Sequence, residues 1–401
     1  MTNRRNFLTA SAAVTLGAAH PLLFAQGSNE TIKIGILIPL TGATSQFGAT
    51  MSKAAQIAAD EINAAGGVNG RKIEVVIEDD QSNPEAAVRA ARKLIDVDKV
   101  VAIGGSYASS VTSAVAPLCW ENKVVLATSS GADSITRLPH QGYIFRTSPT
   151  VSLQGTRVGD LAVELGAKRM FFMGPQTPFA QSYIDIISAI FTKAGGTGSG
   201  LIYEDKKSSY RSEIDQALKS KPDVIVLGGY VPDTSVVLKD LYRAGFEGKR
   251  IGFSFGINQK LVEAVPAEVG EGAYSLVPSA AVGASAYKRL IARMKLEALD
   301  SYSCQVYDHV NMVALALANA PKAEVSGTTV RDNLRSVTTQ SAQSKLVDSA
   351  PDGLKLLASG GLVNFDGASG PLEFAENGDV KGVFFRYEQI QKGKLVVTKV
   401  A

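Results

Sequence analysis

The sequence predicts an α/β protein with two lobes, each built on a mainly parallel β-sheet that is flanked by helices. Three observations favour this fold class. Strand-like apolar runs alternate with amphipathic helices from Ile32 onward. The same alternation restarts near Leu153 as a second series, which is typical of a second α/β lobe. At 401 residues, the chain is long enough to form two hydrophobic cores.

The region from Thr31 to Asp80 forms the first predicted β-loop-α-β unit. Strands are predicted at 32–39 and 73–78, with a helix at 47–65 between them. Five residues of this helix share one face at spacings of three and four: Phe47, Met51, Ala54, Ala58 and Ile62. The loop before the helix lacks the glycine spacing of a phosphate or dinucleotide site, so we expect no cofactor.

The remaining elements follow in the same order along the chain. In the first series we expect helices at 84–96 and 109–121, with strands at 100–104, 124–127 and 143–147. In the second series we expect helices at 153–165, 181–194, 211–219 and 233–244, with strands at 169–174, 200–203, 224–227, 250–253 and 273–277. The glycine cluster at 195–200 should be a loop. Helices at 284–299 and 305–319 precede a mixed region and a tail of short strands with a turn at Asn377-Gly378.

Residues 1–25 have the features of an export signal. Arg4 and Arg5 precede a short apolar run and a small residue suited to cleavage, and the pattern resembles a twin-arginine signal. An ordinary secretory signal is the alternative, and both place the protein outside the cytoplasm. No cysteine lies near the cleavage region, so no lipid anchor is expected. No other apolar run reaches the ~18 to 20 residues that span a bilayer, so we expect a soluble protein.

Composition excludes several classes of partner. The chain is 45% apolar and 20% charged, as expected for a globular protein. Without Arg4 and Arg5, 39 of the 41 basic residues remain against 38 acidic ones. This near-neutral charge gives no general attraction to nucleic acid or anionic lipid. The two cysteines, Cys119 and Cys304, lack zinc or redox spacing. A disulfide between them and two buried thiols both stay open.

Catalytic patterns are absent, so an enzyme is not expected. The three histidines fall outside any metalloprotease or hydrolase motif. The acidic run Glu78-Asp79-Asp80 ends a predicted strand, and we favour a solvated strand end over a metal or acid cluster.

Binding is better supported, because two polar loops follow neighbouring strands. The segment at 104–110 ends one strand and opens a helix, where backbone N–H groups attract anions. N-capping by Ser106 or Ser109 is the plainer interpretation. The segment at 128–134 follows the next strand, so both loops should face one crevice. Phe47, Phe179 and Tyr230 follow strands as well and could line a pocket or belong to the core.

Across nearly the whole chain after residue 30, the motifs resemble the periplasmic solute-binding proteins of branched-chain amino-acid-type ABC importers, the family of the leucine/isoleucine/valine-binding proteins. The matching pieces are Leu40-Thr41-Gly42, Gln46-Phe47-Gly48, Asp60-Glu61-Ile62-Asn63, Gly66-Gly67-Val68-Asn69-Gly70, Asp79-Asp80-Gln81, Ile103-Gly104-Gly105, Ala114-Val115-Ala116-Pro117, Gly228-Gly229-Tyr230, Phe365-Asp366-Gly367, Gly370-Pro371-Leu372 and Asn377-Gly378-Asp379.

This resemblance implies a two-lobed Venus-flytrap of the type I periplasmic binding fold, with three hinge crossings. Lobe 1 would contain 31–149 plus 281–362, and lobe 2 would contain 150–280 plus 363–401. A ligand bound between the lobes would shift the equilibrium toward closure. The implied partners are a small-molecule ligand and an inner-membrane ABC permease with its ATPase. We expect a periplasmic monomer without cofactor, metal or nucleic acid.

The resemblance also implies a set of ligand contacts. Tyr107, Ala108 and Ser109 align with family residues that hold the ligand carboxylate, and Gly131, Ala132 and Asp133 form a second set. Phe47, Phe179 and Tyr230 align with pocket aromatics. The acid that normally pairs with the ligand ammonium aligns with Phe255, and a phenyl ring offers only a cation–π contact of about 0.5–2 kcal/mol.

Two ligand hypotheses follow. The first is an aromatic or otherwise apolar carboxylic acid without an amine, suggested by the four aromatic residues. The second is an aliphatic amino acid, with Asp133 contacting the ammonium. On function, delivery to a permease is favoured, and a periplasmic ligand-sensing receptor or amide-type sensor on the same fold is the alternative.

Overall fold

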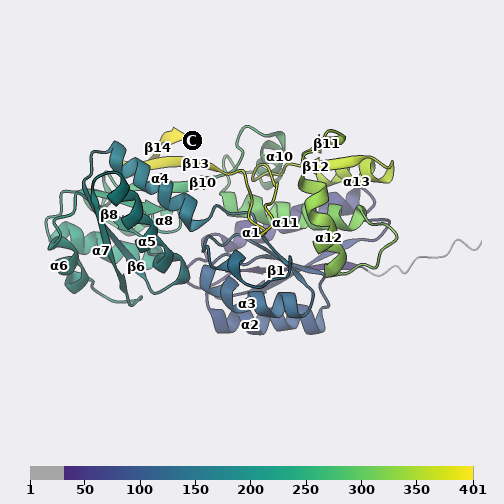
Figure 1. Cartoon of the computed structure of the whole chain (residues 1–401), viewed down its shortest axis with the longest axis horizontal. Coiled ribbons are helices and arrows are strands. Elements are labelled where there is room, and N and C mark those ends of the chain that lie inside the picture. Colours follow the sequence, from purple (N-terminus) through teal and green to yellow (C-terminus); the bar gives the residue numbers. More distant parts are fainter. Residues whose placement is uncertain (1–30, 401) are drawn as a thin grey trace, which may run out of the picture. The chain divides into compact units, whose positions relative to one another are not determined.

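Five parallel strands form the first sheet of the computed structural model, which describes residues 31–400 (Figure 1). The predicted export signal at 1–25 lies outside the described residues. In spatial order the strands are β2 (Ile73–Asp79), β1 (Ile32–Ile38), β3 (Ala102–Gly105), β4 (Val125–Thr128) and β5 (Ile144–Arg146). Ile34 of β1 pairs with Val75 on one side and Ala102 on the other. Because the strands are parallel, their carboxyl ends meet at one edge.

Helices cover both faces of this sheet, so its strands are apolar on both sides. Ile36 belongs to the core shared with α1 (Gly48–Ala64) and α11 (Ser301–Ala318), whereas the next residue, Leu37, packs with α2 (Pro84–Arg92) and α3 (Ser109–Glu121). Figure 1 shows α2 and α3 on the opposite side of β1 from α11. The predicted face of α1 is confirmed, since Met51, Ala54, Ala58 and Ile62 are buried.

Every residue of α11 is buried, and this helix packs against α1, α12 (Gly327–Thr338) and α13 (Ala350–Ala358). It begins at Ser301, four residues before the predicted start, because the Asp300 side chain caps it by accepting a hydrogen bond from Ser303 N at 2.8 Å.

The preceding helix, α10 (Ser285–Met294), ends before the predicted residue 299 because Lys295 adopts a left-handed φ of 58°. Strands β11 (Ser344–Val347) and β12 (Leu362–Phe365) form a separate parallel pair.

The second sheet has seven strands, five of them parallel. In spatial order they are β14 (Lys394–Val400), β13 (Phe384–Gln391), β10 (Tyr274–Ser279), β9 (Lys249–Phe253), β8 (Val224–Leu227), β6 (Arg169–Pro175) and β7 (Thr197–Tyr203). Strand β13 pairs antiparallel with β10, and β14 pairs antiparallel with β13. The helices of this part are α4 (Val151–Glu164), α5 (Pro178–Lys193), α6 (Arg211–Leu218), α7 (Val231–Arg243), α8 (Gln259–Ala264) and α9 (Ala267–Gly270).

The glycine cluster at 195–200 differs from the prediction of a loop, because β7 already begins at Thr197. A Cβ at Gly198 would lie 2.8 Å from the Cα of Ser188, and one at Gly200 would lie 3.1 Å from Ile184. The glycines therefore serve the close approach of α5 to β7, and the strand continues through them.

Both cysteines are buried and free. Burial raises the pKa of the Cys119 thiol to about 12. Of the two interpretations left open, the structure therefore supports two buried thiols.

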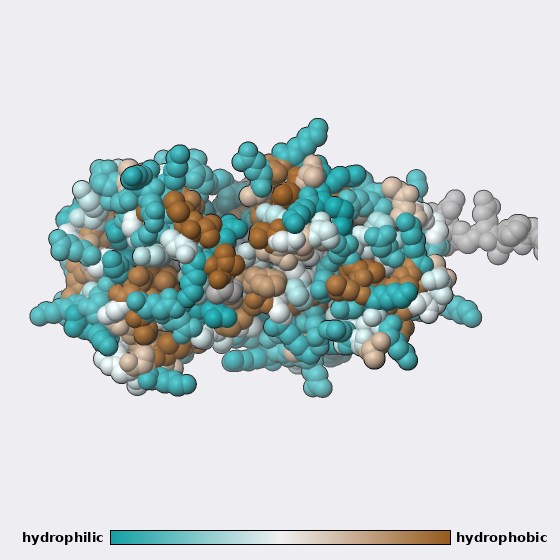
Figure 2. Space-filling view, turned by 90° about the horizontal axis from the view of Figure 1, so that it is seen from above, coloured by the Kyte–Doolittle hydropathy of each residue, from teal (hydrophilic) through white to brown (hydrophobic). Residues whose placement is uncertain are grey.

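The whole described region belongs to one compact unit, so the division into two lobes stays a prediction. On the face shown in Figure 2, brown apolar patches are interrupted by hydrophilic side chains. Within residues 31–400, no helix has the length and apolar character needed to cross a membrane.

Candidate ligand-binding site

Loops at the carboxyl ends of strands from both large sheets line one cavity. This is where open parallel sheets bind ligands. The first sheet contributes loops after β3, β4 and β5, and the second contributes loops after β6, β8 and β9. The lining residues are Tyr107, Ser109, Ser129, Gly131, Ser148, Gln154, Pro175, Thr177, Phe179, Gly228, Tyr230, Phe255 and Tyr302.

The cavity is small, with a volume of about 30 Å³. A single water requires about 10–15 Å³ on this scale. A solute the size of an amino acid or an aromatic acid would therefore require the cavity walls to move apart.

None of the lining residues carries a charged side chain. The polar groups are hydroxyls, one amide and backbone atoms. Ser129 Oγ is buried and makes no hydrogen bond within the described chain. Ser109 Oγ accepts a hydrogen bond from Ala132 N at 3.3 Å, which leaves its own hydrogen available as a donor. The site therefore offers neutral hydrogen-bond donors, which can bind an anion without a basic side chain.

Two helices that begin at the cavity lack side-chain caps. Helix α3 has Ala108 at its N-cap position and α7 has Tyr230 there, and neither start has a side-chain cap. The alternative interpretation, N-capping of α3 by Ser106 or Ser109, is wrong: Ser106 Oγ bonds Thr112 Oγ1 at 2.7 Å, and Ser109 Oγ accepts from Ala132 N. Uncapped N–H groups and the helix dipole both favour a negative ligand group.

Aromatic rings form the wall on the side of the first sheet. Tyr107 and Tyr302 lie 4.7 Å apart between ring centroids, edge to face, and both line the cavity. Phe47 lies behind them, 5.1 Å from Tyr107 and 5.0 Å from Tyr302. Burial raises the pKa of Tyr302 to about 12 and that of Tyr107 well above its usual value. Both phenols therefore stay protonated and can donate hydrogen bonds.

A second aromatic wall comes from the second sheet. Phe255 lies 5.1 Å from Phe179 and 5.4 Å from Tyr230. Phe253 stacks behind Phe255 at 5.2 Å. Tyr183 packs under Phe179 at 5.1 Å, and its buried hydroxyl makes no hydrogen bond within the described residues. An apolar or aromatic ligand body would be well matched to this wall.

Two hydrogen bonds connect the walls. Ser254 Oγ and Tyr302 Oη are 3.2 Å apart, and Gln46 Nε2 donates to the Phe255 carbonyl at 3.4 Å. These contacts join loops of the first sheet and helix α11 to the loop after β9.

The acidic run at the end of β2 is not a solvated strand end. Asp79 accepts hydrogen bonds from Leu40 N and Thr41 N at 3.0 and 3.1 Å, so it shapes the loop before α1. Asp80 is fully buried, and its Oδ2 makes no hydrogen bond within 31–400. Burial raises the pKa of Asp80 to about 7.

A sequence profile described as "Periplasmic binding protein" matches residues 31–356. The chain belongs to this family. The leucine-, isoleucine-, valine-, threonine- and alanine-binding protein of Pseudomonas aeruginosa is 27% identical over 339 residues, which are 80% of this chain and 86% of that protein. Members of this kind are substrate-binding proteins of ABC-type transport, and this periplasmic binding protein has that general function.

Solved structures show the same fold. A leucine-binding protein from Thermotoga maritima has a TM-score of 0.78 and 23% identity, covering 92% of this chain and 98% of that one. An ABC-transporter solute-binding protein from R. palustris, solved with benzoate, has a TM-score of 0.73 and 18% identity, covering 92% and 96%. Together they confirm the predicted α/β type I periplasmic binding fold.

The cavity of this periplasmic binding protein brings together six of the ten predicted contacts: Tyr107, Ser109, Gly131, Phe179, Tyr230 and Phe255. Their role in binding stays a prediction. Gly131 is suited to its place because a Cβ there would lie 3.0 Å from Gln154 Nε2 and 3.3 Å from the Phe179 ring.

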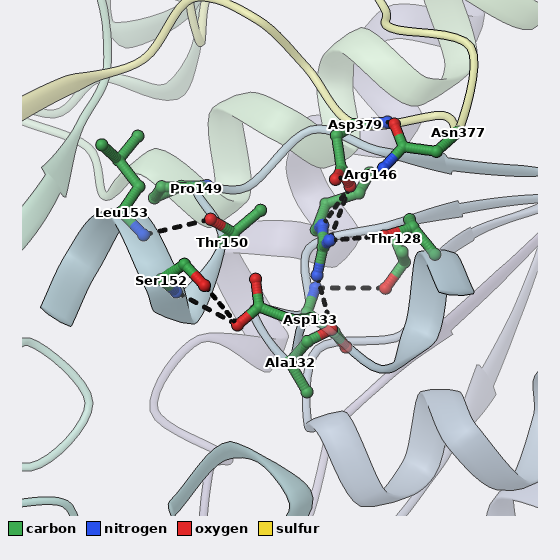
Figure 3. Close-up of polar contacts among 12 residues, drawn as sticks. Thr128, Ala132, Asp133, Arg146, Pro149, Thr150, Ser152, Leu153, Asn377 and Asp379 are labelled. Carbon is green, nitrogen blue, oxygen red and sulfur yellow. Dashed lines mark hydrogen bonds and ion pairs between the residues drawn. The ribbon is translucent and has the colours of Figure 1, made fainter. Parts of the chain in front are cut away.

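The other four predicted contacts do not line the cavity. Phe47 lies behind two tyrosines, Ala108 is the N-cap residue of α3, and the Ala132 carbonyl bonds Arg146. The Asp133 carboxylate points to the start of α4, where Oδ2 accepts from Ser152 N at 3.1 Å and Ser152 Oγ at 3.0 Å (Figure 3).

Seven lining residues were not among the predicted contacts. Ser129 and Gly228 lie inside motifs that the sequence did indicate, and Pro175 and Thr177 follow β6, so the strand-end rule could have found them. Ser148 lies just after β5, near a predicted join between lobes. Gln154 and Tyr302 are on helices and carry no such signal.

Proposed function

We propose that this protein captures a small carboxylic acid without an amine, aromatic or otherwise apolar, and delivers it to an inner-membrane ABC permease and its ATPase. Capture would take place in the periplasm. The observation that carries the proposal is the absence of any charged side chain among the residues that line the cavity.

Hydroxyl and backbone donors support a carboxylate at one end of the cavity. Among residues 31–400, Ser129 Oγ has no hydrogen-bond partner, Ser109 Oγ has a free hydrogen, and the N terminus of α3 has no side-chain cap. Hydrogen bonds to a charged acceptor contribute about 1.5–3 kcal/mol each. Three such donors can hold a carboxylate without a basic residue.

The aromatic wall from the second sheet favours a ligand without an amine. The resemblance implies that Phe255 stands where amino-acid-binding relatives have an acid, and its ring packs with Phe179 and Tyr230. An ammonium placed there would be desolvated without an ionic partner, which is unfavourable. The benzoate-bound protein from R. palustris shows that this fold accepts an aromatic acid.

An aliphatic amino acid is the second candidate, because relatives such as the Pseudomonas aeruginosa protein bind amino acids. In that case Asp133 would have to contact the ammonium. Its Oδ2 is held by Ser152 at the start of α4, so Oδ1 is the oxygen that could accept from the ammonium without breaking those two hydrogen bonds. An Asp133→Ala variant that binds leucine as tightly as the parent would exclude this arrangement.

A thermal-shift screen of ligand-free protein tests the proposal. Benzoate, 4-hydroxybenzoate and phenylacetate would be compared with leucine, isoleucine and aliphatic amides. A ligand at 100 times its Kd adds about 2.7 kcal/mol of stability. We expect stabilisation by the acids and none by the amino acids. Stabilisation by leucine with inert benzoate would overturn the proposal.

A further inference from the structure

Arg146, at the end of β5, is fully buried and connects three segments of the chain (Figure 3). Its Nη1 donates to the Ala132 carbonyl at 2.6 Å, and its Nη2 donates to Thr136 Oγ1 at 2.7 Å. Its Nε and Nη2 donate to Asp379 Oδ1 at 2.8 and 2.6 Å. The planar guanidinium therefore holds the loop after β4 and the C-terminal tail in one fixed arrangement.

The tail reaches Arg146 through the turn at Asn377-Gly378-Asp379. Arg146 N donates to the Gly378 carbonyl at 2.8 Å, and Val380 N donates to the Arg146 carbonyl at 3.0 Å. Gly378 has a φ of 87°, and a Cβ there would lie 2.1 Å from the Ile144 carbonyl oxygen. Only glycine allows the turn to approach β5 this closely. Asn377 Nδ2 also donates to Asp379 Oδ2 at 2.8 Å, which orients the carboxylate.

At its other end, the guanidinium binds the carbonyl of Ala132, the residue after Gly131, and Gly131 lines the cavity. The Gly131 carbonyl accepts from Val151 N at 2.8 Å, and Ala132 N donates to Ser109 Oγ at 3.3 Å. Arg146 holds the Ala132 carbonyl, so hydrogen bonds fix three backbone groups of this loop: the Gly131 carbonyl, the Ala132 N–H and the Ala132 carbonyl. The Gly131 N–H makes no hydrogen bond with any residue in 31–400. It is the donor that this arrangement leaves for a ligand.

We propose that Arg146 and Asp379 form a positioning pair that fixes the Gly131–Ala132 backbone, so that the Gly131 N–H is directed at the bound carboxylate. The ligand part of this inference rests on the proposed function. The pair acts through the loop and does not touch the ligand. Because the fork geometry of the guanidinium sets two directions at once, a lysine at position 146 would retain the charge but lose the alignment.

The test uses Arg146→Lys and Asp379→Asn in the full chain, with Asp223→Asn as the matched control. Asp223 also accepts bonds from an arginine, Arg169 Nη2 at 2.7 Å, and from the backbone N–H of Lys168 at 2.9 Å, at the opposite end of β6 from the cavity. Three quantities are measured for each protein: benzoate affinity by calorimetry, the urea unfolding midpoint, and the NMR resonance of the Gly131 amide after 15N-glycine labelling.

We expect Arg146→Lys and Asp379→Asn each to weaken benzoate binding about tenfold, equivalent to about 1.4 kcal/mol, and to shift the Gly131 resonance. The control should lose stability with neither effect. A Gly131 resonance that stays in place in both variants, or a benzoate affinity within twofold of the parent, would overturn the proposal.

Failure of the proposed function is a separate result. If the parent binds leucine and not benzoate, the same comparison is made with leucine, because the carboxylate is common to both. If the parent binds neither, the Gly131 resonance alone decides: a shift in both variants supports the positioning pair, and no shift refutes it.

Discussion

Two adjacent serines on the loop after β4 have different roles at the residue scale. The hydroxyl of Ser130 belongs to the fold, because its single hydrogen is shared between the carbonyls of Ser106 and Tyr107, at 2.8 and 2.9 Å, and its oxygen contacts Thr112 Oγ1. The hydroxyl of Ser129 has no hydrogen-bond partner within the described chain, and Ser129 is one of the residues that line the cavity. A buried polar group without a partner is unfavourable unless a ligand satisfies it.

Ser129→Ala should therefore weaken carboxylate binding about tenfold while leaving stability unchanged or slightly higher. Ser130→Ala serves as the comparison and should lower the free energy of unfolding by about 1–3 kcal/mol. Calorimetry and urea denaturation measure the two effects. Equal affinities of Ser129→Ala and parent would show that this hydroxyl does not contact the ligand.

Asp79 and Asp80 are adjacent acids with opposite pKa shifts. Burial raises the pKa of Asp80 to about 7, with smaller opposition from the Ser82 N–H and a further increase from the charge of Asp79. Burial also acts on Asp79, but hydrogen bonds from Thr41, Gln81 and Leu40 outweigh it and lower the pKa of that carboxyl. Asp80 also interacts electrostatically with Tyr230 of the cavity wall.

A raised folded-state pKa means that the native protein binds more protons than the unfolded chain between about pH 4 and pH 7. The contribution of Asp80 to stability is thus present at low pH and lost as the pH rises through 7. The free energy of unfolding of Asp80→Asn, taken relative to that of the parent, should therefore be higher at pH 8 than at pH 5, by on the order of 2–3 kcal/mol. Asp79→Asn should instead lose stability above about pH 4. Urea titrations at the two pH values check both signs, and parallel curves for Asp80→Asn and parent would contradict the assignment.

At the scale of elements, α4 and α5 pack closely through two glycines. A Cβ at Gly155 would lie 2.7 Å from Ile186 Cγ2, and one at Gly159 would lie 2.6 Å from Ile190 Cγ2. These helices carry Gln154 and Phe179 to the cavity, so their separation sets part of its width.

Gly159→Ala should destabilise the protein. Overpacking costs about 1–3 kcal/mol, which outweighs the roughly 1 kcal/mol that alanine adds through helix propensity. Thr156→Ala, on the exposed face of α4, should be near neutral. Urea denaturation compares them, and a Gly159→Ala variant more stable than the parent would show that the helices separate without cost.

Most elements could be predicted because apolar periodicity and caps are local. The helix from Pro84 and the βα alternation are examples. The elements that differ from the prediction depend on contacts that the pattern of apolar residues along the sequence does not reveal. The glycines of β7 form a strand because α5 lies against them, and α11 begins early because of the Asp300 cap.

The candidate site was predicted only where loops follow strands. Tyr302 lies in α11, nearly 200 residues after Tyr107, and the two rings meet only through tertiary packing. Asp133 was predicted to contact the ligand from its position in a motif. In the structure its carboxylate instead accepts a hydrogen bond from Ser152 at the start of α4.

At the scale of the whole molecule, access to the cavity depends on contacts between loops of the two sheets. Ser254 and Tyr302 connect the walls across a cavity of only about 30 Å³. Binding a solute the size of benzoate or leucine would thus be coupled to a change in how these loops meet. A ligand shifts such an equilibrium only by its difference in affinity between the two states.

The most direct test of the central claim is a calorimetric titration of ligand-free protein with leucine and with 4-methylpentanoate, which has the same carbon skeleton and carboxylate but no amine. Because none of the described residues that line the cavity is acidic, we predict that 4-methylpentanoate binds at least tenfold more tightly, a difference of about 1.4 kcal/mol. Tighter binding of leucine would contradict the account and would show that an ammonium partner is supplied from elsewhere in the protein.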